Sequence, residues 1–245
     1  MIQTFPNIVI VGGGAGGLEL ATKLGRKLGK KQRANITLID KNRTHIWKPL
    51  LHEVATGSLD TSVDGVAYSA HAAKHGFQFV LGEFIKLDPN SNELLLKEHH
   101  DDEGNLLLPL RTIKFDLVVI AIGSISNDFN TPGVSQYCFF LDSQKQAERF
   151  QNSLLNSFTR VHQNSTEDSQ DTLSIAIVGG GATGVELAAE LRHSAKHLVN
   201  YGFSGIKPEN VTITIVEAAD RVMPVLSPKA SQAIRRQLEK IGVEV

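Results

Sequence analysis

Short apolar runs alternate along the chain with longer stretches in which apolar residues recur every three or four positions, which predicts strands that alternate with helices. A strand, a helix and a second strand are expected near the start, and the same order returns near the end. The two expected sets cover residues 8–11, 15–28 and 36–39, and residues 173–178, 181–198 and 211–216. Because β–α–β units pair their strands in parallel, this pattern predicts an α/β fold.

The stretch between the two units is less regular. Its expected elements are a helical stretch over 50–73, a meander of short strands over 77–80, 84–87 and 93–97, a strand over 115–122 and a helix over 142–162. Polar residues at 99–105 and 164–171 predict solvated loops, the first at a hairpin tip. Thr131-Pro132-Gly133 indicates a boundary between two domains, 1–130 and 131–245.

One glycine-rich segment occurs twice, as VGGGAGGLEL at 11–20 and as VGGGATGVEL at 178–187, with eight of ten positions identical. A glycine turn that opens a helix binds phosphate, because the first N–H groups of the helix lack partners and the helix dipole favours an anion. The glycines of such a turn have separate roles: to turn the chain, to admit a pyrophosphate and to let helix pack on strand. These roles fall in that order to Gly12, Gly14 and Gly17, and to Gly179, Gly181 and Gly184.

A carboxylate follows the second strand of each unit, where it can accept hydrogen bonds from a ribose. Asp40 comes 28 residues after Gly12, and Glu217 comes 38 residues after Gly179. Both spacings exceed the usual ~20 residues, and long loops account for the excess. Glu217 favours NADH over NADPH because a carboxylate repels a 2′-phosphate, although Arg221 nearby moderates that preference.

Composition excludes some other classes of protein. The 25 Lys and Arg balance 26 Asp and Glu, so nucleic acid is not an expected partner; the basic residues at 26–33 indicate a solvated helix end. The single cysteine, Cys138, excludes an internal disulfide and is expected as a small buried apolar residue. The start of the chain lacks the pattern of a signal peptide, and no apolar run reaches about 18 residues. A cytoplasmic location is therefore expected. No metal site is expected from the adjacent histidines and aspartates at 99–102, which converge poorly.

Two dinucleotide folds in one chain indicate hydride transfer between a nicotinamide and a flavin. At this point the sequence resembles the pyridine nucleotide–flavin oxidoreductases, whose N-terminal fold binds FAD and whose inserted second fold binds NAD(P)H. A third segment agrees: Thr112, four residues and then LVVIAIG at 117–123 are similar to the strand that this family closes on FAD. The resemblance implies that Ala121 and Gly123 contact FAD.

Further motifs distinguish members of the family. Disulfide reductases carry a cysteine pair just after the first β–α–β unit, which is absent here, and Cys138 does not match sulfide:quinone oxidoreductases. The segment HIWKPLLHEVATG at 45–57 is similar to the one that type II NADH dehydrogenases place beside the flavin, which implies that His45 and Pro49 bind the cofactor. The alternative is an ordinary helix start, with Pro49 in its first turn.

The resemblance implies that NADH reduces FAD and that the electrons pass to a membrane quinone without proton pumping. It also implies a catalytic role for Glu186, since the matching glutamate of type II NADH dehydrogenases lies near the nicotinamide. The alternative for Glu186 is a favourable contact with the helix dipole alone, because Glu19 occupies the same place after the first glycine turn.

The sequence stops at KIGVEV, within an expected strand, so the inserted second domain is expected to be incomplete. In the family, a C-terminal region supplies the contacts with quinone and with the cytoplasmic membrane, on which the full-length protein would be peripheral, and homodimers are usual. Two other functions stay open: an NADH-dependent reductase for a soluble acceptor such as ferredoxin, and a nucleotide-sensing module without turnover.

Overall fold

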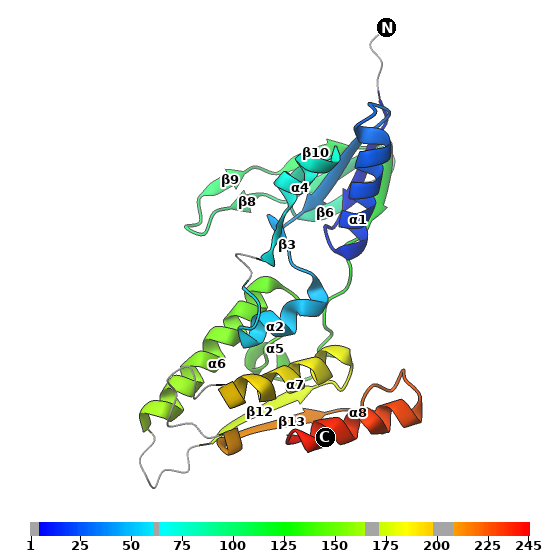
Figure 1. The fold of residues 1–245 in the computed structure, drawn as a ribbon. Helices are drawn as coiled ribbons and strands as arrows, with labels where there is room; N and C mark the ends of the chain where they lie inside the picture. Colours follow the sequence, from blue (N-terminus) through cyan, green and yellow to red (C-terminus); the bar gives the residue numbers. More distant parts are fainter. Residues whose placement is uncertain (1–4, 61–63, 165–171, 198–207) are drawn as a thin grey trace. The chain divides into compact units, whose positions relative to one another are not determined.

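The computed structural model describes residues 5–60, 64–164, 172–197 and 208–245 (Figure 1). Its packing divides the chain into two compact units. The first consists of Met1–Lys48 and Ser62–Ile125, and the second of Pro49–Thr61 and Ser126–Val245. The segment Pro49–Thr61 therefore packs with residues that follow much later in the sequence.

A four-stranded parallel sheet forms the centre of the first unit, in the order β11-β1-β2-β5. Its strands are β1 (Asn7–Val11), β2 (Asn35–Asp40), β5 (Gln78–Leu81) and β11 (Leu117–Ile120). Side chains alternate between the two faces of the sheet. In β1, Ile8 and Ile10 contribute to one core cluster, whereas Val9 and Val11 contribute to another, so both faces are covered.

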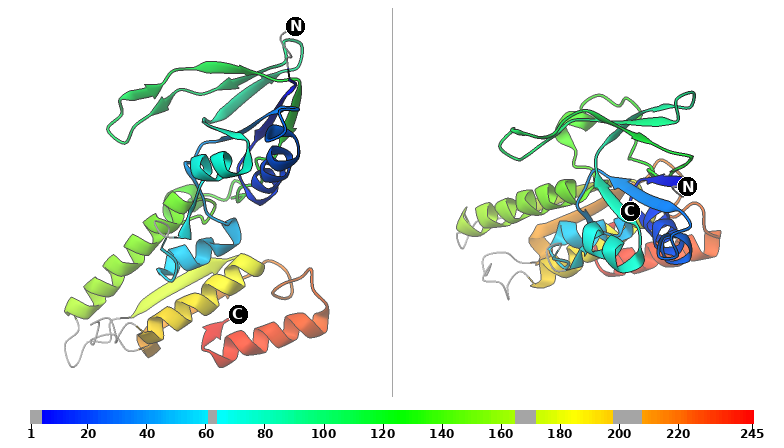
Figure 2. Two further views of the ribbon diagram at one scale, coloured as in Figure 1. Left: turned by 45° about the horizontal axis from the view of Figure 1, so that its top comes forward. Right: turned by 90° about the horizontal axis from the view of Figure 1, so that it is seen from above.

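Helices cover one face of this sheet and a second sheet covers the other (Figure 2). The helices are α1 (Ala15–Leu24), which continues into the π-helical turn η1 (Gly25–Gly29), and α4 (Tyr68–His75). The antiparallel sheet consists of β6 (Phe84–Asp88), β7 (Glu93–Leu96) and β10 (Arg111–Lys114). Two short pairs complete the unit: β3 (Thr44–His45) with β4 (Val66–Ala67), and β8 (His99–His100) with β9 (Leu106–Leu108).

The second unit contains a three-stranded parallel sheet in the order β12-β13-β14. Its strands are β12 (Leu173–Val178), β13 (Val211–Val216) and β14 (Val243–Glu244). Its helices are η2 (Lys48–Leu50, whose first residue belongs to the first unit), α2 (Leu51–Thr56), α5 (Val134–Tyr137), α6 (Gln144–Asn164), α7 (Ala182–His197), η4 (Pro208–Asn210) and α8 (Pro228–Lys240). Helix α7 packs on β13, and both Leu191 of α7 and Ile213 of β13 are buried. The predicted α/β fold with two Rossmann-like units is thus confirmed.

Two predictions for the intervening stretch are wrong. The helical stretch expected over 50–73 is broken into α2, β4 and α4, with α2 ending at Gly57. The expected meander loses its first member, because β5 follows helix α4 and pairs in parallel with β2, with Leu38 opposite Phe79. The hairpin tip over 99–105 is confirmed, between β8 and β9.

Cys138 is exposed, so the prediction of a buried apolar residue is wrong. It directly follows the one-turn helix α5, which has no buried residue and whose last residue, Tyr137, is 77% exposed. The chain therefore does not pack into a core at this point. The polar loop expected over 164–171 lies outside the described residues from position 165 onward. Within the described part of the chain, no helix is long and apolar enough to cross a membrane, and no group of three histidine, cysteine or acidic residues gathers as a metal site would require.

Candidate functional site

The first glycine turn joins the end of β1 to the start of α1. Gly12 has a φ angle of +103°, a conformation that favours glycine, and its N–H donates to the carbonyl oxygen of Ile39 over 2.8 Å. A Cβ atom on Gly17 would overlap the carbonyl oxygen of Gly12, so helix and turn approach as only glycine allows. A Cβ on Gly14, by contrast, would meet no atom within 4 Å. The start of α1 therefore borders open space.

The second glycine turn, between β12 and α7, repeats this geometry. Gly179 has a φ angle of +110°, and its N–H donates to the carbonyl oxygen of Val216 over 2.8 Å. A Cβ on Gly184 would overlap the carbonyl oxygen of Gly179, whereas a Cβ on Gly181 would meet no atom within 4 Å. The two turns thus share a first glycine with positive φ, a third glycine that packs closely on the turn, and a second glycine beside open space.

The carboxylate that follows each second strand bonds to its own glycine turn. Asp40 Oδ2 accepts the N–H of Gly13 over 2.7 Å, and Glu217 Oε2 accepts the N–H of Gly180 over 2.6 Å. Glu217 Oε1 also accepts the N–H of Ala219 over 2.9 Å. The donors at Ala219 and Gly180 lower the pKa of Glu217, because they stabilise its charged form.

Tyr68, a residue of α4, stabilises the first turn. Its hydroxyl donates to the carbonyl oxygen of Gly13 over 2.6 Å, and the side chain is only 2% exposed. Burial, and secondarily the charge of Asp40, raises the pKa of Tyr68, so the hydroxyl stays a donor. The ring of His45 lies 6.1 Å from that of Tyr68, and burial lowers the pKa of His45. Sequence reasoning missed Tyr68, because an aromatic residue in a helical stretch is typical of core packing.

The corresponding carbonyl group of the second turn has a different partner. The N–H of Met223 donates to the carbonyl oxygen of Gly180 over 2.7 Å. Where the first turn is stabilised by a side chain, the second is stabilised by backbone.

The end of β11 lies beside the first turn. The N–H of Ala121 donates to the carbonyl oxygen of Val11 over 2.7 Å, and a Cβ on Gly12 would overlap the carbonyl oxygen of Ala121. Gly123 follows with a φ angle of +72° and no atom within 4 Å of its Cβ position. The third segment of the sequence is thus next to the first turn.

The segment 45–57 is divided between the two units. His45 lies in β3 of the first unit, whereas Pro49 belongs to the second. Pro49 lies in the 3₁₀ turn η2 directly before α2, so it does stand at a helix start, as the alternative interpretation expects.

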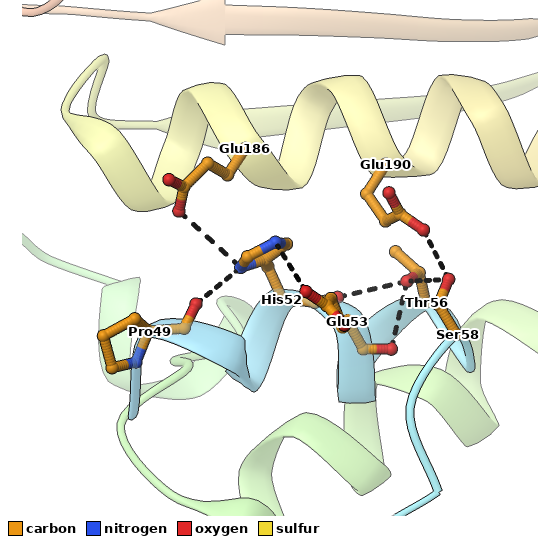
Figure 3. Close-up of polar contacts among 7 residues, drawn as sticks. All are labelled: Pro49, His52, Glu53, Thr56, Ser58, Glu186 and Glu190. Carbon is orange, nitrogen blue, oxygen red and sulfur yellow. Dashed lines mark hydrogen bonds and ion pairs between the residues drawn. The ribbon is translucent and has the colours of Figure 1, made fainter. Parts of the chain in front are cut away.

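Glu186 lies on α7 and faces α2 (Figure 3). Its Oε2 atom is 3.7 Å from Nδ1 of His52, whose side chain is 12% exposed, while that of Glu186 is 50% exposed. Glu19, at the same place after the first turn, pairs instead with Lys23 of its own helix over 3.0 Å. The helix dipole explains an acidic residue at both places, but the contact with a second helix belongs to Glu186.

The predicted residues therefore form two sets, one in each unit. The first set consists of Gly12, Gly14, Gly17, Asp40, His45, Ala121 and Gly123, and the second of Pro49, Gly179, Gly181, Gly184, Glu186 and Glu217. Each set offers helix-start N–H groups, open space beside a glycine and a carboxylate, which together suit a dinucleotide. Their binding of a cofactor stays a prediction.

Comparison with known proteins identifies the family to which the chain belongs. A family model described as pyridine nucleotide-disulphide oxidoreductase matches residues 6–245. A type II NADH:quinone oxidoreductase from Haemophilus influenzae is 47% identical over 251 residues, which cover 98% of this chain and 56% of that protein. This chain thus spans little more than half the length of that relative.

Two solved structures share the fold. NDH2 from Plasmodium falciparum in complex with NADH has a TM-score of 0.82 and 22% identity, covering 99% of this chain and 48% of that one. A ferredoxin reductase from Rhodopseudomonas palustris has a TM-score of 0.71 and 18% identity, covering 98% of this chain and 49% of that one. At these identities the likeness concerns the fold alone.

Proposed function

Because the chain belongs to the pyridine nucleotide-disulphide oxidoreductase family, we propose that it forms the FAD- and NADH-binding part of a type II NADH:quinone oxidoreductase. In this proposal, residues 1–130 bind FAD and residues 131–245 bind NADH. The overall reaction converts NADH, a proton and a quinone into NAD⁺ and a quinol, without proton pumping.

The observation that carries the proposal is the duplicated turn. A pyrophosphate is an anion, and the open space at Gly14 and at Gly181 lies where the first N–H groups of α1 and α7 lack helical partners. Each turn also has its carboxylate, Asp40 or Glu217, which has lone pairs left to accept ribose hydroxyls besides the N–H groups it already accepts. Two such sites suit two dinucleotides.

When bound, FAD would accept a hydride from NADH and pass the two electrons on to a quinone. The chain's own contribution in this scheme is to hold both cofactors in place, which lowers the barrier by removing the entropy cost of alignment. His45, Pro49, Ala121 and Gly123 are assigned to the flavin side. Glu186 is assigned the catalytic role beside the nicotinamide.

The proposed electron acceptor is a membrane quinone, and the proposed location is the cytoplasmic face of the membrane, as a peripheral protein and a homodimer. We assign contact with quinone and membrane to sequence outside these residues, because the chain spans 56% of the relative from Haemophilus influenzae.

The test is anaerobic mixing of the FAD-loaded protein with NADH while the absorbance of oxidised flavin is followed. We expect NADH to bleach the flavin, and NADPH to do so far less, because of Glu217. Two variants serve as controls for each other. Gly14→Val should lose FAD, whereas Gly181→Val should retain FAD and fail to be bleached, since each methyl pair fills the open space of one turn.

The outcomes separate the functions. Release of FAD by Gly181→Val would contradict the assignment of cofactors to turns. NADH binding without bleaching would favour a nucleotide-sensing module. Bleaching followed by electron transfer to ferredoxin, with none to a quinone, would favour a reductase for a soluble acceptor.

A further inference from the structure

The short helix α2 packs against α6 and α7 within the second unit. Its apolar residues Leu51, Val54 and Ala55 are at most 3% exposed, which fixes α2 on its neighbours. Because these apolar residues fix the orientation of α2, the positions of its polar residues relative to α7 are fixed as well. Figure 3 shows that His52 points toward Glu186 of α7.

His52 makes the first of two contacts with α7. Its Nδ1 atom is 2.8 Å from the carbonyl oxygen of Pro49, and because a carbonyl oxygen only accepts, Nδ1 carries the hydrogen. The same Nδ1 atom is 3.7 Å from Oε2 of Glu186, and Nε2 is 4.0 Å from Oε1 of Glu53. The imidazole therefore lies between two carboxylates, one on its own helix and one on α7.

Ser58 makes the second contact. Its hydroxyl donates to Oε1 of Glu190, which lies one turn after Glu186 on the same face of α7. The N–H of Ser58 donates to the carbonyl oxygen of Glu53 over 2.9 Å, which gives this carbonyl group near the end of α2 a hydrogen-bond partner. Two acidic residues of α7 are thus matched by one polar residue of α2 and by one that follows it.

We propose that His52 is a positioning residue for Glu186, which holds the carboxylate in one orientation on the helix that follows the second glycine turn. The inference rests on the proposed function, in which Glu186 acts beside the nicotinamide. A glutamate that is half exposed otherwise samples several rotamers, and ordering it in advance removes an entropy cost from the reaction.

The two halves of the duplicated sequence supply an internal comparison. Glu19 stands at the same place after the first glycine turn, yet it pairs with Lys23 of its own helix. That pair is an ordinary i, i+4 contact on an exposed helix surface. Only the glutamate of the proposed NADH side is met by a histidine from another helix.

The kinetic test measures the limiting rate of flavin reduction by NADH, and the apparent dissociation constant for NADH, by anaerobic rapid mixing. We expect His52→Leu to lower the limiting rate about two- to fivefold, the size expected for the loss of a partly exposed polar contact, with little change in NADH affinity. His52→Asn, whose amide nitrogen can replace Nδ1 as a donor, should restore most of the rate. His193→Gln, an exposed histidine on α7, should leave it unchanged.

A positioning role also requires that the effects of His52 and Glu186 are not additive. In the Glu186→Gln background, His52→Leu should lower the rate no further. An equal decrease in both backgrounds, or an unchanged rate in His52→Leu alone, would overturn the inference.

A second readout does not depend on activity. The imidazole nitrogen resonances of His52 should shift in Glu186→Gln and stay in place in Glu190→Gln, and unchanged resonances in Glu186→Gln would overturn the inference. If NADH fails to bleach the wild type, the proposed function fails, and these resonances still decide whether His52 holds Glu186.

Discussion

Replacement of Gly184 by alanine tests whether close packing of helix on turn explains the third glycine. The added methyl group would overlap the carbonyl oxygen of Gly179 and stand 3.3 Å from Cγ2 of Ile177. The overlapped atom belongs to backbone that is fixed by the hydrogen bond to Val216, so it cannot rotate away as a side chain would. Overpacking of this kind costs about 1–3 kcal/mol.

Alanine also has a compensating advantage, because glycine inside a helix is less favourable by roughly 0.5–1 kcal/mol. With central values of about 2 kcal/mol for the overlap and about 0.75 kcal/mol for the helix preference, the net loss is about 1 kcal/mol, which lowers the unfolding temperature of a chain of this size by roughly 2–4 °C. The assay is thermal unfolding followed by circular dichroism, with urea unfolding as a check on the free energy of unfolding.

Thr183→Ala is the matched control, since it introduces the same residue one position earlier, at an exposed site of α7. It should leave the unfolding temperature unchanged or raise it slightly, because alanine is the better helix former. If Gly184→Ala unfolded at or above the temperature of the wild type, the packing explanation would be refuted.

Three further predictions concern the two turns and the helices behind the first. Tyr68→Phe should lower the free energy of unfolding by about 1 kcal/mol in urea, because the carbonyl oxygen of Gly13 loses its donor. Glu217→Gln should reduce the preference for NADH over NADPH, measured as the ratio of flavin reduction rates, by about fivefold or more, since like charges ~4 Å apart repel by ~1 kcal/mol even in water. Burial lowers the pKa of His71 and His75 in the folded state, so the unfolded state binds more protons. Stability should therefore be complete above about pH 6.5 and fall below it, and His75→Gln should flatten that dependence in urea unfolding.

Much of the fold could be predicted because its signals are local. The strands over 173–178 and 211–216 appear with the predicted bounds, and both helices begin at their glycine turns. Helix α8 was missed, although Ser227 caps its first turn and Pro228 follows as the first helical residue, a combination that favours a helix start. The helix has few apolar residues, so the apolar spacing that predicts a helix is weak there.

What could not be predicted depends on contacts between distant residues. The run at 77–80 has the composition of a meander strand, and only its pairing with β2 decides that it is β5 of the parallel sheet. Local patterns likewise do not predict the contact of His52 with Glu186. The residues before and after the segment 49–61 belong to the first unit, whereas this segment packs in the second. Spacing reveals a turn, but not what packs beside it.

The duplicated segment shows where such differences arise. Its repeated residues make the same bonds in both turns, from Gly12 to the end of β2 and from Gly179 to the end of β13. The partners that differ, Tyr68 for the first turn and Met223 for the second, come from elements outside the repeat, and so does His52. We therefore expect the repeated motif to specify a site for a pyrophosphate. The unrepeated elements around the motif are expected to decide which dinucleotide is held and what chemistry follows, and Tyr68→Phe, His52→Leu and Glu217→Gln change residues of these elements.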